Sequence, residues 1–85
     1  MNISNQIDAS GLSCPIPVLK ARKALAGMIF GQVLKLVATD KGSVADIPAF
    51  ARQTGNVLLS AYEDNGHYVF FIQKVAFKPI DLARA

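Results

Sequence analysis

The sequence predicts an α/β two-layer sandwich, in which a four-stranded mixed sheet carries two helices on one face. Two segments with helical spacing of apolar residues alternate with segments rich in β-formers, which indicates the order βαβαββ. An Asn-Gly pair at positions 65–66 separates the last two β-rich runs and is a strong hairpin signal. A chain of 85 residues has room for one core. We expect a single domain over residues 1–75, followed by a tail, 76–85, whose role the sequence does not indicate.

The first half of the domain is predicted to be a strand, a turn and a helix. Residues 6–9 are expected to form a short strand, and Gly11 permits the sharp turn that follows it. A helix is predicted over residues 15–28, because proline is favoured at the first helical position. The side expected to face the core carries Val18, Ala21, Leu25 and Met28. The opposite side carries Ile16, Lys20 and Lys23, with Leu19 near its edge, so we expect an exposed apolar patch ringed by lysines.

The middle of the chain is predicted to be a strand over residues 33–39, a loop over 40–43 and a helix over about 47–54. Ser43 and Asp46 are both candidate N-caps, and Pro48 favours the later start. Gly55 is placed to end this helix. Its expected buried stripe consists of Ile47, Phe50, Ala51 and Thr54. Because a helix joins the first two strands, they should be parallel, with a right-handed crossover.

The final hairpin joins residues 57–63 to 68–74. A two-residue turn at Asn65-Gly66 predicts three cross-strand pairs: Asp64 with His67, Ala61 with Phe70, and Leu59 with Ile72. That register leaves four apolar or aromatic residues on the uncovered face of the sheet: Leu58, Tyr62, Val69 and Phe71. Either the tail, with Phe77, Ile80 and Leu82, covers this face, or the face forms a weak homodimer. The sequence leaves both alternatives open.

Cys14 is the candidate reactive group. It precedes Pro15 at the predicted start of the first helix, where the partial positive charge favours a thiolate. We therefore expect its pKa to lie moderately below the free-cysteine value of about 8.5. The loop holding Asp40, Lys41 and Ser43 should lie at the same edge of the sheet, and Lys41 either favours the thiolate or is a solvated charge. The alternative is that a lone cysteine is an inert, buried apolar residue.

Several other kinds of site are not expected. His67 is predicted to lie at the far end of the sheet, so a Cys–His catalytic pair is not predicted. One cysteine and one histidine cannot supply the usual four zinc ligands, and neither a P-loop nor a G-x-G-x-x-G motif is present. We therefore predict no metal and no cofactor.

The cellular setting is predicted to be the cytoplasm. No apolar run reaches the roughly 18 residues typical of a membrane span, and the first residues do not resemble a signal peptide. A single cysteine cannot form an internal disulfide, which fits a reducing compartment. The net charge of +3 is mild. Lys20, Arg22 and Lys23 form the densest basic patch, a solvated face or a docking site for an acidic protein or RNA. Tyr68 and Phe70 alternate as base-stacking aromatics do, but the register buries Phe70, so direct nucleic-acid binding is not expected.

Two motifs resemble those of the TusA/SirA-like sulfur-carrier family. The run DASGLSCPIP at residues 8–17 is similar to the family signature, in which an Asp and a Gly-Leu precede a Cys-Pro-x-Pro that opens a helix. The matching residues are Asp8, Gly11, Cys14, Pro15 and Pro17. The run DKGSVADIPAF at residues 40–50 is similar to the second block of the family. The resemblance covers about residues 6–75.

The resemblance implies a two-layer α/β sandwich whose Cys14 accepts sulfane sulfur as a persulfide. The donor would be a cysteine desulfurase or a rhodanese-like protein, and the acceptor a protein in a relay toward tRNA thiolation, molybdenum-cofactor synthesis or sulfur oxidation. Such a protein is a sulfurtransferase-like carrier rather than a stand-alone enzyme. Ile16 stands where the best-known tRNA-thiolation carriers have an acidic residue. The residues expected to support Cys14 or dock partners are Asp8, Gly11, Pro15, Ile16, Pro17, Lys20, Lys23, Asp40 and Lys41.

Two other functions fit the residues alone. The first is a small basic module that binds RNA or a regulatory protein, with Cys14 structural. The second is a redox sensor in which Cys14 is oxidised to a sulfenic acid. Sulfur loading, oxygen addition and the absence of covalent change distinguish the three by mass.

Overall fold

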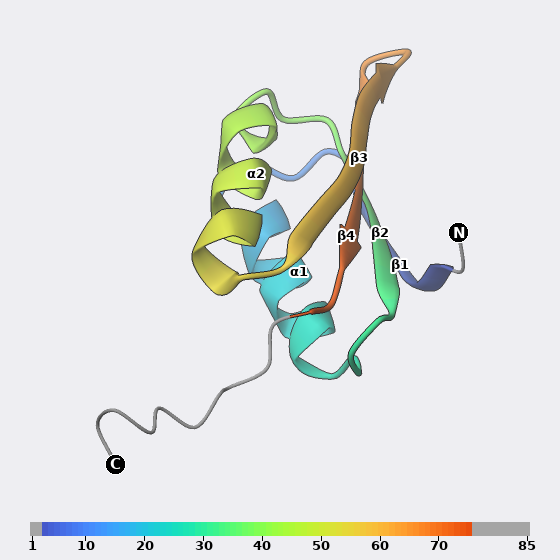
Figure 1. Ribbon diagram of the computed structural model, residues 1–85. Coiled ribbons are helices and arrows are strands. Elements are labelled where there is room, and N and C mark those ends of the chain that lie inside the picture. Colours follow the sequence, from blue (N-terminus) through green and yellow to red (C-terminus); the bar gives the residue numbers. More distant parts are fainter. Residues whose placement is uncertain (1–2, 76–85) are drawn as a thin grey trace.

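A single mixed sheet with the strand order β1-β2-β4-β3 carries both helices on one face (Figure 1). The structure is a computed structural model and describes residues 3–75. The element order confirms the predicted βαβαββ sandwich. The elements are β1 (Ile3–Ala9), α1 (Ile16–Ala26), β2 (Val33–Ala38), α2 (Ser43–Thr54), β3 (Val57–Asp64) and β4 (His67–Gln73).

The arrangement of the strands brings three connections to one end of the sheet, the end at which β1 and β2 finish. This end is called the Cys14 edge below. Strand β1 is parallel to β2, so the loops that follow both strands lie at the same edge, as predicted. Strand β4 is antiparallel to β2 and pairs Tyr68 with Ala38, the last residue of β2. The β3–β4 turn therefore lies at this edge too. The prediction that His67 lies at the far end of the sheet is wrong, because β4 starts where β2 ends.

The core lies between the helices and the inner face of the sheet. Helix α1 contributes Ala21 and Leu25 as predicted, and Met28 just beyond it is also buried. Val18 is only partly buried, whereas the side chain of Pro17 is almost completely buried in the first turn. The helix is shorter than the predicted 15–28, because Gly27 caps its end. The sheet and α2 complete the cluster with Ala9, Leu34, Leu36, Ile47, Phe50, Phe70 and Ile72.

Helix α2 begins at Ser43, four residues before the predicted start at Ile47. The turn before it supplies the first hydrogen bonds, since the Ser43 N–H donates to the Asp40 carbonyl at 3.0 Å. Pro48 lies inside the helix and removes one backbone donor without ending it. The prediction that Pro48 marks a later start is therefore wrong. Gly55 ends the helix in the left-handed conformation, with φ of 78°, as predicted.

The hairpin has the predicted turn but contains a bulge. Asp64 pairs with His67 and Ala61 with Phe70, as expected from the Asn-Gly turn. An irregularity between Leu58 and Ser60 makes Leu58, and not Leu59, the partner of Ile72. Leu58 packs against the core, and Leu59 is 41% exposed. The predicted faces of these two leucines are therefore reversed, because one extra residue in a strand inverts the alternation before it.

The uncovered face of the sheet carries aromatic side chains. The rings of Tyr62 and Phe71 stack with their centroids 6.3 Å apart. Val69 is 6% exposed although no helix covers this face. Whether the tail covers the face stays a prediction, since residues 76–85 lie outside the described residues. Within residues 3–75, neither helix has the length and apolar character that a membrane crossing requires.

Candidate functional site around Cys14

Cys14 lies in the loop between β1 and α1, where the loop after β2 and the start of α2 meet it. Its backbone N–H donates to Oδ2 of Asp40 at 3.0 Å, and its Sγ lies 3.3 Å from Oγ of Ser43. Ser43 is the first residue of α2 and is fully buried. The prediction that Asp40 and Ser43 gather beside Cys14 is confirmed. The sulfur thus has a hydroxyl partner held rigidly by a helix.

Gly42 is a member of the site that the sequence analysis did not identify. A Cβ placed on Gly42 would lie 2.9 Å from Oδ2 of Asp40, 3.4 Å from Cβ of Cys14 and 3.5 Å from its Sγ. The backbone of Gly42 therefore passes directly over the thiol and the carboxylate. Its φ of −59° is open to any residue, so glycine is required here by space rather than by conformation. The sequence signal that could have indicated this close approach is a glycine placed between Asp40 and the start of a helix.

The environment of Cys14 favours the protonated thiol. Burial raises the pKa of the Cys14 thiol, the hydrogen bond from Ser43 lowers it, and the carboxylates of Asp40 and Asp46 raise it again. The net pKa is raised, so the predicted depression is wrong. The main cause is the burial of the sulfur, and the nearby carboxylates of Asp40 and Asp46 add to it. The thiolate fraction increases only as the pH rises toward this higher pKa.

Asp8 and Gly11 hold the loop in front of Cys14. The N–H of Ser10 donates to Oδ1 of Asp8 at 3.0 Å, and hydrogen bonding by Ser10 lowers the pKa of Asp8. Gly11 has φ of 79° and donates its N–H to Oγ1 of Thr39 at 2.8 Å. The positive φ confirms that the turn needs glycine. Gly11 thus connects the β1–α1 loop to Thr39 after β2, and Asp8 stabilises the first turn of the same loop. Both residues position the loop in this structure.

The two predicted groups of lysines differ in their relation to the thiol. Lys41 is exposed and is not among the residues that shift the pKa of Cys14, so the expectation that it favours the thiolate is not supported. On α1, Ile16 is 43% exposed and Leu19 is 55% exposed. Lys20 and Lys23 are exposed beside them. The predicted apolar patch ringed by lysines is therefore confirmed as a surface.

Removing the Ser43 hydroxyl should raise the pKa of Cys14 further. Ser43→Ala deletes the group that lowers this pKa and leaves the two carboxylates that raise it. Without this hydrogen bond the thiolate loses a stabilising donor, so the alkylation midpoint should move to higher pH. The pH dependence of iodoacetamide alkylation measures it. Ser43→Thr keeps the hydroxyl and serves as the control, and an unchanged midpoint in Ser43→Ala would show that the contact has no electrostatic role.

The chain is similar to sulfur carriers over most of its length. The family model described as sulfurtransferase TusA matches residues 5–74. The sulfur carrier protein TusA of Allochromatium vinosum is 51% identical over 73 residues, which cover 86% of this chain and 96% of that protein. The sulfur carrier protein TusA of Pseudomonas entomophila is 41% identical over 70 residues, covering 82% and 88%.

The solved structures agree with this similarity. A SirA-like protein from Desulfitobacterium hafniense superposes with a TM-score of 0.75 at 32% identity, covering 84% of this chain and 97% of that one. The sheet of β1-β2-β4-β3 with two helices on one face is consistent with that fold. The comparisons do not support the alternative of an RNA-binding or regulatory module. A sulfur carrier works by contact with a donor protein and an acceptor protein. The chain belongs to the TusA family of sulfur carriers.

Proposed function

We propose that Cys14 is the residue that carries the sulfur, as a persulfide. The observation that supports it most strongly is the contact of its Sγ with the buried Ser43 hydroxyl, at the edge where three connections of the sheet meet. A cysteine desulfurase or a rhodanese-like protein supplies the sulfur, and a protein thiol accepts it in the cytoplasm. The chain itself acts as a carrier, and its partners contribute most of the catalytic groups.

Loading and unloading are both displacements at sulfur. In loading, the Cys14 thiol gives up its proton to solvent, and the thiolate attacks the outer sulfur of a persulfide on the donor. A new S–S bond forms on Cys14, and the donor cysteine leaves as a thiolate, which takes up a proton. In unloading, the acceptor thiolate attacks the outer sulfur and Cys14 leaves as the thiolate. No net oxidation occurs in either step.

The raised pKa of Cys14 makes its thiolate a poorer leaving group, so neighbouring groups must stabilise the thiolate during unloading. Because its pKa is raised, the free thiol remains protonated at neutral pH and is protected from oxidation. When Cys14 leaves during unloading, the Ser43 hydroxyl lies within hydrogen-bond distance of the developing thiolate. The outer sulfur of the persulfide lies about 2 Å beyond Sγ, which carries the reacting atom toward a partner.

The test of this function is the mass of the protein after incubation with a cysteine desulfurase and cysteine. We expect a gain of one sulfur atom on Cys14, reversible by a thiol reductant. A gain of oxygen with peroxide and none of sulfur would instead identify a redox sensor. No covalent change, with retention of RNA at moderate salt, would identify a binding module.

The exposed patch on α1 is expected to dock the sulfur donor or the acceptor, and loading by a desulfurase tests the donor. Ile16 is two residues from Cys14, and its exposure shows that its side chain is available to a partner. Ile16→Asp should slow loading by the desulfurase about tenfold through loss of one buried apolar contact. The free energy of unfolding should change by no more than about 0.5 kcal/mol.

The matched control for that variant is Ile29→Asp. Ile29 is 69% exposed and lies in the α1–β2 connection, away from the Cys14 edge. Its replacement should leave the loading rate unchanged. Equal loading by the wild type and Ile16→Asp, measured from the rate of sulfur addition by mass spectrometry, would show that this patch does not contact the donor.

A further inference from the structure

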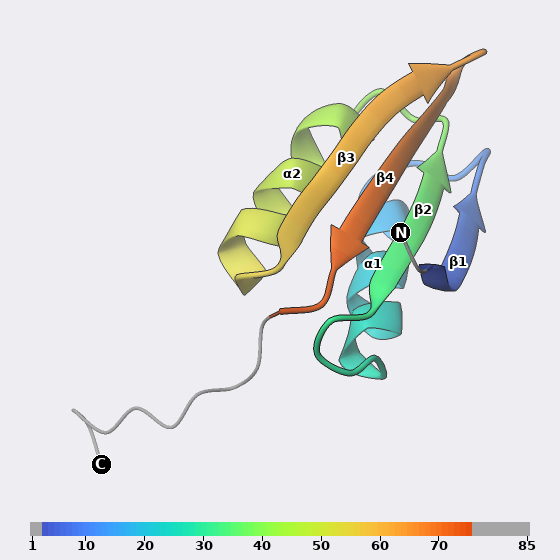
Figure 2. The same ribbon diagram turned by 45° about the vertical axis from the view of Figure 1, so that its right-hand side comes forward.

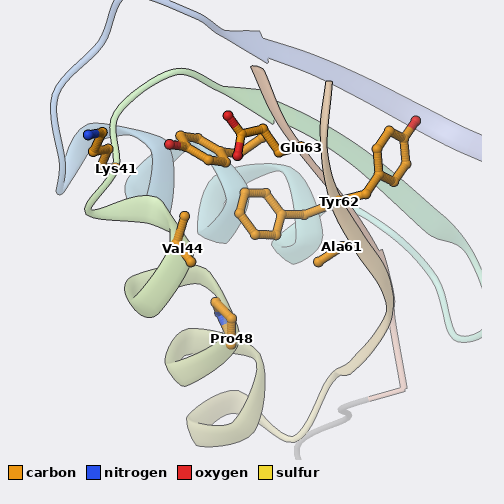
Figure 3. A pocket seen from close by; sticks show the side chains of 8 residues that line it. Lys41, Val44, Pro48, Ala61, Tyr62 and Glu63 are labelled. Carbon is orange, nitrogen blue, oxygen red and sulfur yellow. The ribbon is translucent and has the colours of Figure 1, made fainter. Parts of the chain in front are cut away.

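A cavity of about 490 Å³ lies between the first half of α2 and the β3–β4 hairpin. Figure 3 shows Val44 and Pro48 on α2 projecting toward the strand that carries Ala61. The ring of Tyr62 points away from the cavity, in agreement with its stacking on Phe71 on the other face (Figure 3). The cavity is within the size range of protein ligand sites. It is lined by Lys41, Val44, Pro48, Ala61, Tyr62, Glu63, Tyr68 and Phe70.

Among the described residues 3–75, no strand pairs with the outer edge of β3, the strand beside this cavity. Strand β3 is the outermost strand of the sheet, and it pairs with β4 on its inner side (Figure 2). Residues 57–62 contain neither a charged residue nor a proline, so the protections of this edge are the bulge after Leu58 and the two acidic residues that end the strand, Glu63 and Asp64. Val44, on the opposite wall, is 51% exposed. A free strand edge beside an apolar groove, with a helix as its second wall, is an arrangement that binds extended peptides by strand addition.

The cavity begins next to the segment that contacts Cys14. Lys41 lines the cavity, and the two residues that follow it, Gly42 and Ser43, approach the Cys14 sulfur. Sulfur transfer brings an acceptor thiol to within bonding distance of the outer sulfur, so every acceptor covers this end of the cavity. Lys41 and Glu63 both line the cavity, so a bound segment meets charges of both signs there.

We propose that the cavity and the edge of β3 dock an extended segment of the acceptor protein. This segment carries the acceptor cysteine at the Lys41 end and a nearby aliphatic side chain that fills the cavity between Val44 and Ala61. The proposal rests on Cys14 as the sulfur-carrying residue.

The transfer itself is the unloading step already described. The thiol of the segment loses its proton to solvent, and its thiolate forms a bond to the outer sulfur of Cys14. The S–S bond on Cys14 breaks, and Cys14 leaves as a thiolate that is then protonated. Docking adds no chemistry and acts by holding the two sulfur atoms close together.

The experiment compares two short acetylated peptides as acceptors. Both contain one cysteine next to a glutamate, and one carries leucines where the other carries serines. Cys14 is first loaded with inorganic polysulfide, and the mass of the protein shows whether loading succeeded. Each peptide rate is divided by the rate with N-acetylcysteine. We expect the leucine peptide to react about tenfold faster than the serine peptide, the effect of burying one aliphatic side chain.

Two variants of Val44 test whether the preference for the leucine peptide arises from the cavity. Val44→Asp and the uncharged Val44→Ser should reduce the preference for the leucine peptide to within about twofold, because each removes apolar surface from the wall. Ile29→Asp should keep the full preference, since that residue is exposed at a distance from the cavity. Amide signals of β3 should shift in the wild type when the leucine peptide is added.

Three results would overturn the proposal. The first is equal rates with the two peptides, and the second is an undiminished preference in both Val44 variants. The third is a shift of the β3 amides with protein concentration alone, which would identify a second copy of the chain as the occupant. Failure of Cys14 to load with polysulfide is a separate outcome and would count against the proposed function itself.

Discussion

Cys14→Ser should abolish sulfur loading and leave the fold intact. A persulfide forms on a cysteine sulfur and not on a serine oxygen, and this chain has one cysteine. Cys14 lies in a loop and is only partly buried, outside the main core cluster. A serine hydroxyl keeps a polar partner for Ser43, so the free energy of unfolding should change by no more than about 1 kcal/mol.

Mass spectrometry and thermal unfolding together check this result. Wild type and Cys14→Ser are incubated with the same desulfurase and cysteine, and the gain of sulfur is compared. A Cys14→Ser protein that still gains sulfur would exclude Cys14 as the carrying residue. A variant that fails to fold would show instead that Cys14 has a structural role.

Gly42→Ala should slow sulfur transfer about a hundredfold with little change in stability. The added methyl group would lie 2.9 Å from Oδ2 of Asp40 and 3.5 Å from Sγ of Cys14. The carboxylate is the end of a side chain and moves aside, which removes its hydrogen bond from the Cys14 N–H. A displacement of the reacting atom by about 1 Å is sufficient for a loss of this size. The backbone of Gly42 already has helical angles, so unfolding should change by no more than about 1 kcal/mol.

Gly27→Ala is the matched control for that variant. A methyl group at Gly27 would meet only the Ala24 carbonyl oxygen, at 3.9 Å, which is an ordinary contact. Loading by a desulfurase and alkylation by iodoacetamide should both stay at wild-type rates in this control. If Gly42→Ala transfers sulfur at the wild-type rate, the close approach of the backbone to the thiol has no functional importance.

The order of the elements and the placement of Cys14 were accessible from local sequence patterns. Asn65-Gly66 determines a tight turn, and the structure has positive φ at both residues. The spacing of Ala21 and Leu25 determines which side of α1 is buried. Because β1 and β2 are joined through a helix, the sequence also predicts that the loops holding Cys14 and Asp40 meet at one edge.

The partner of β2 was decided by the tertiary structure. A hairpin turn determines which residues of β3 and β4 face each other, but not which of the two strands pairs with β2. In the structure β4 takes that place, and His67 comes to the Cys14 edge. Similarly, the bulge at Leu58 arises from packing, since it brings Leu58 rather than Leu59 onto the core.

The chemical character of the site also depended on tertiary contacts. By itself, the sequence determined that Cys14 precedes a helix, and this position alone favours a thiolate. Only the fold brings Asp40, Asp46 and Ser43 to the sulfur, from a segment that lies 26 or more residues further along the chain. Burial and the two carboxylates then outweigh the Ser43 hydroxyl, so the pKa of Cys14 is raised. Contacts of this kind are set by distances of a few ångströms between distant segments, which local sequence patterns do not encode.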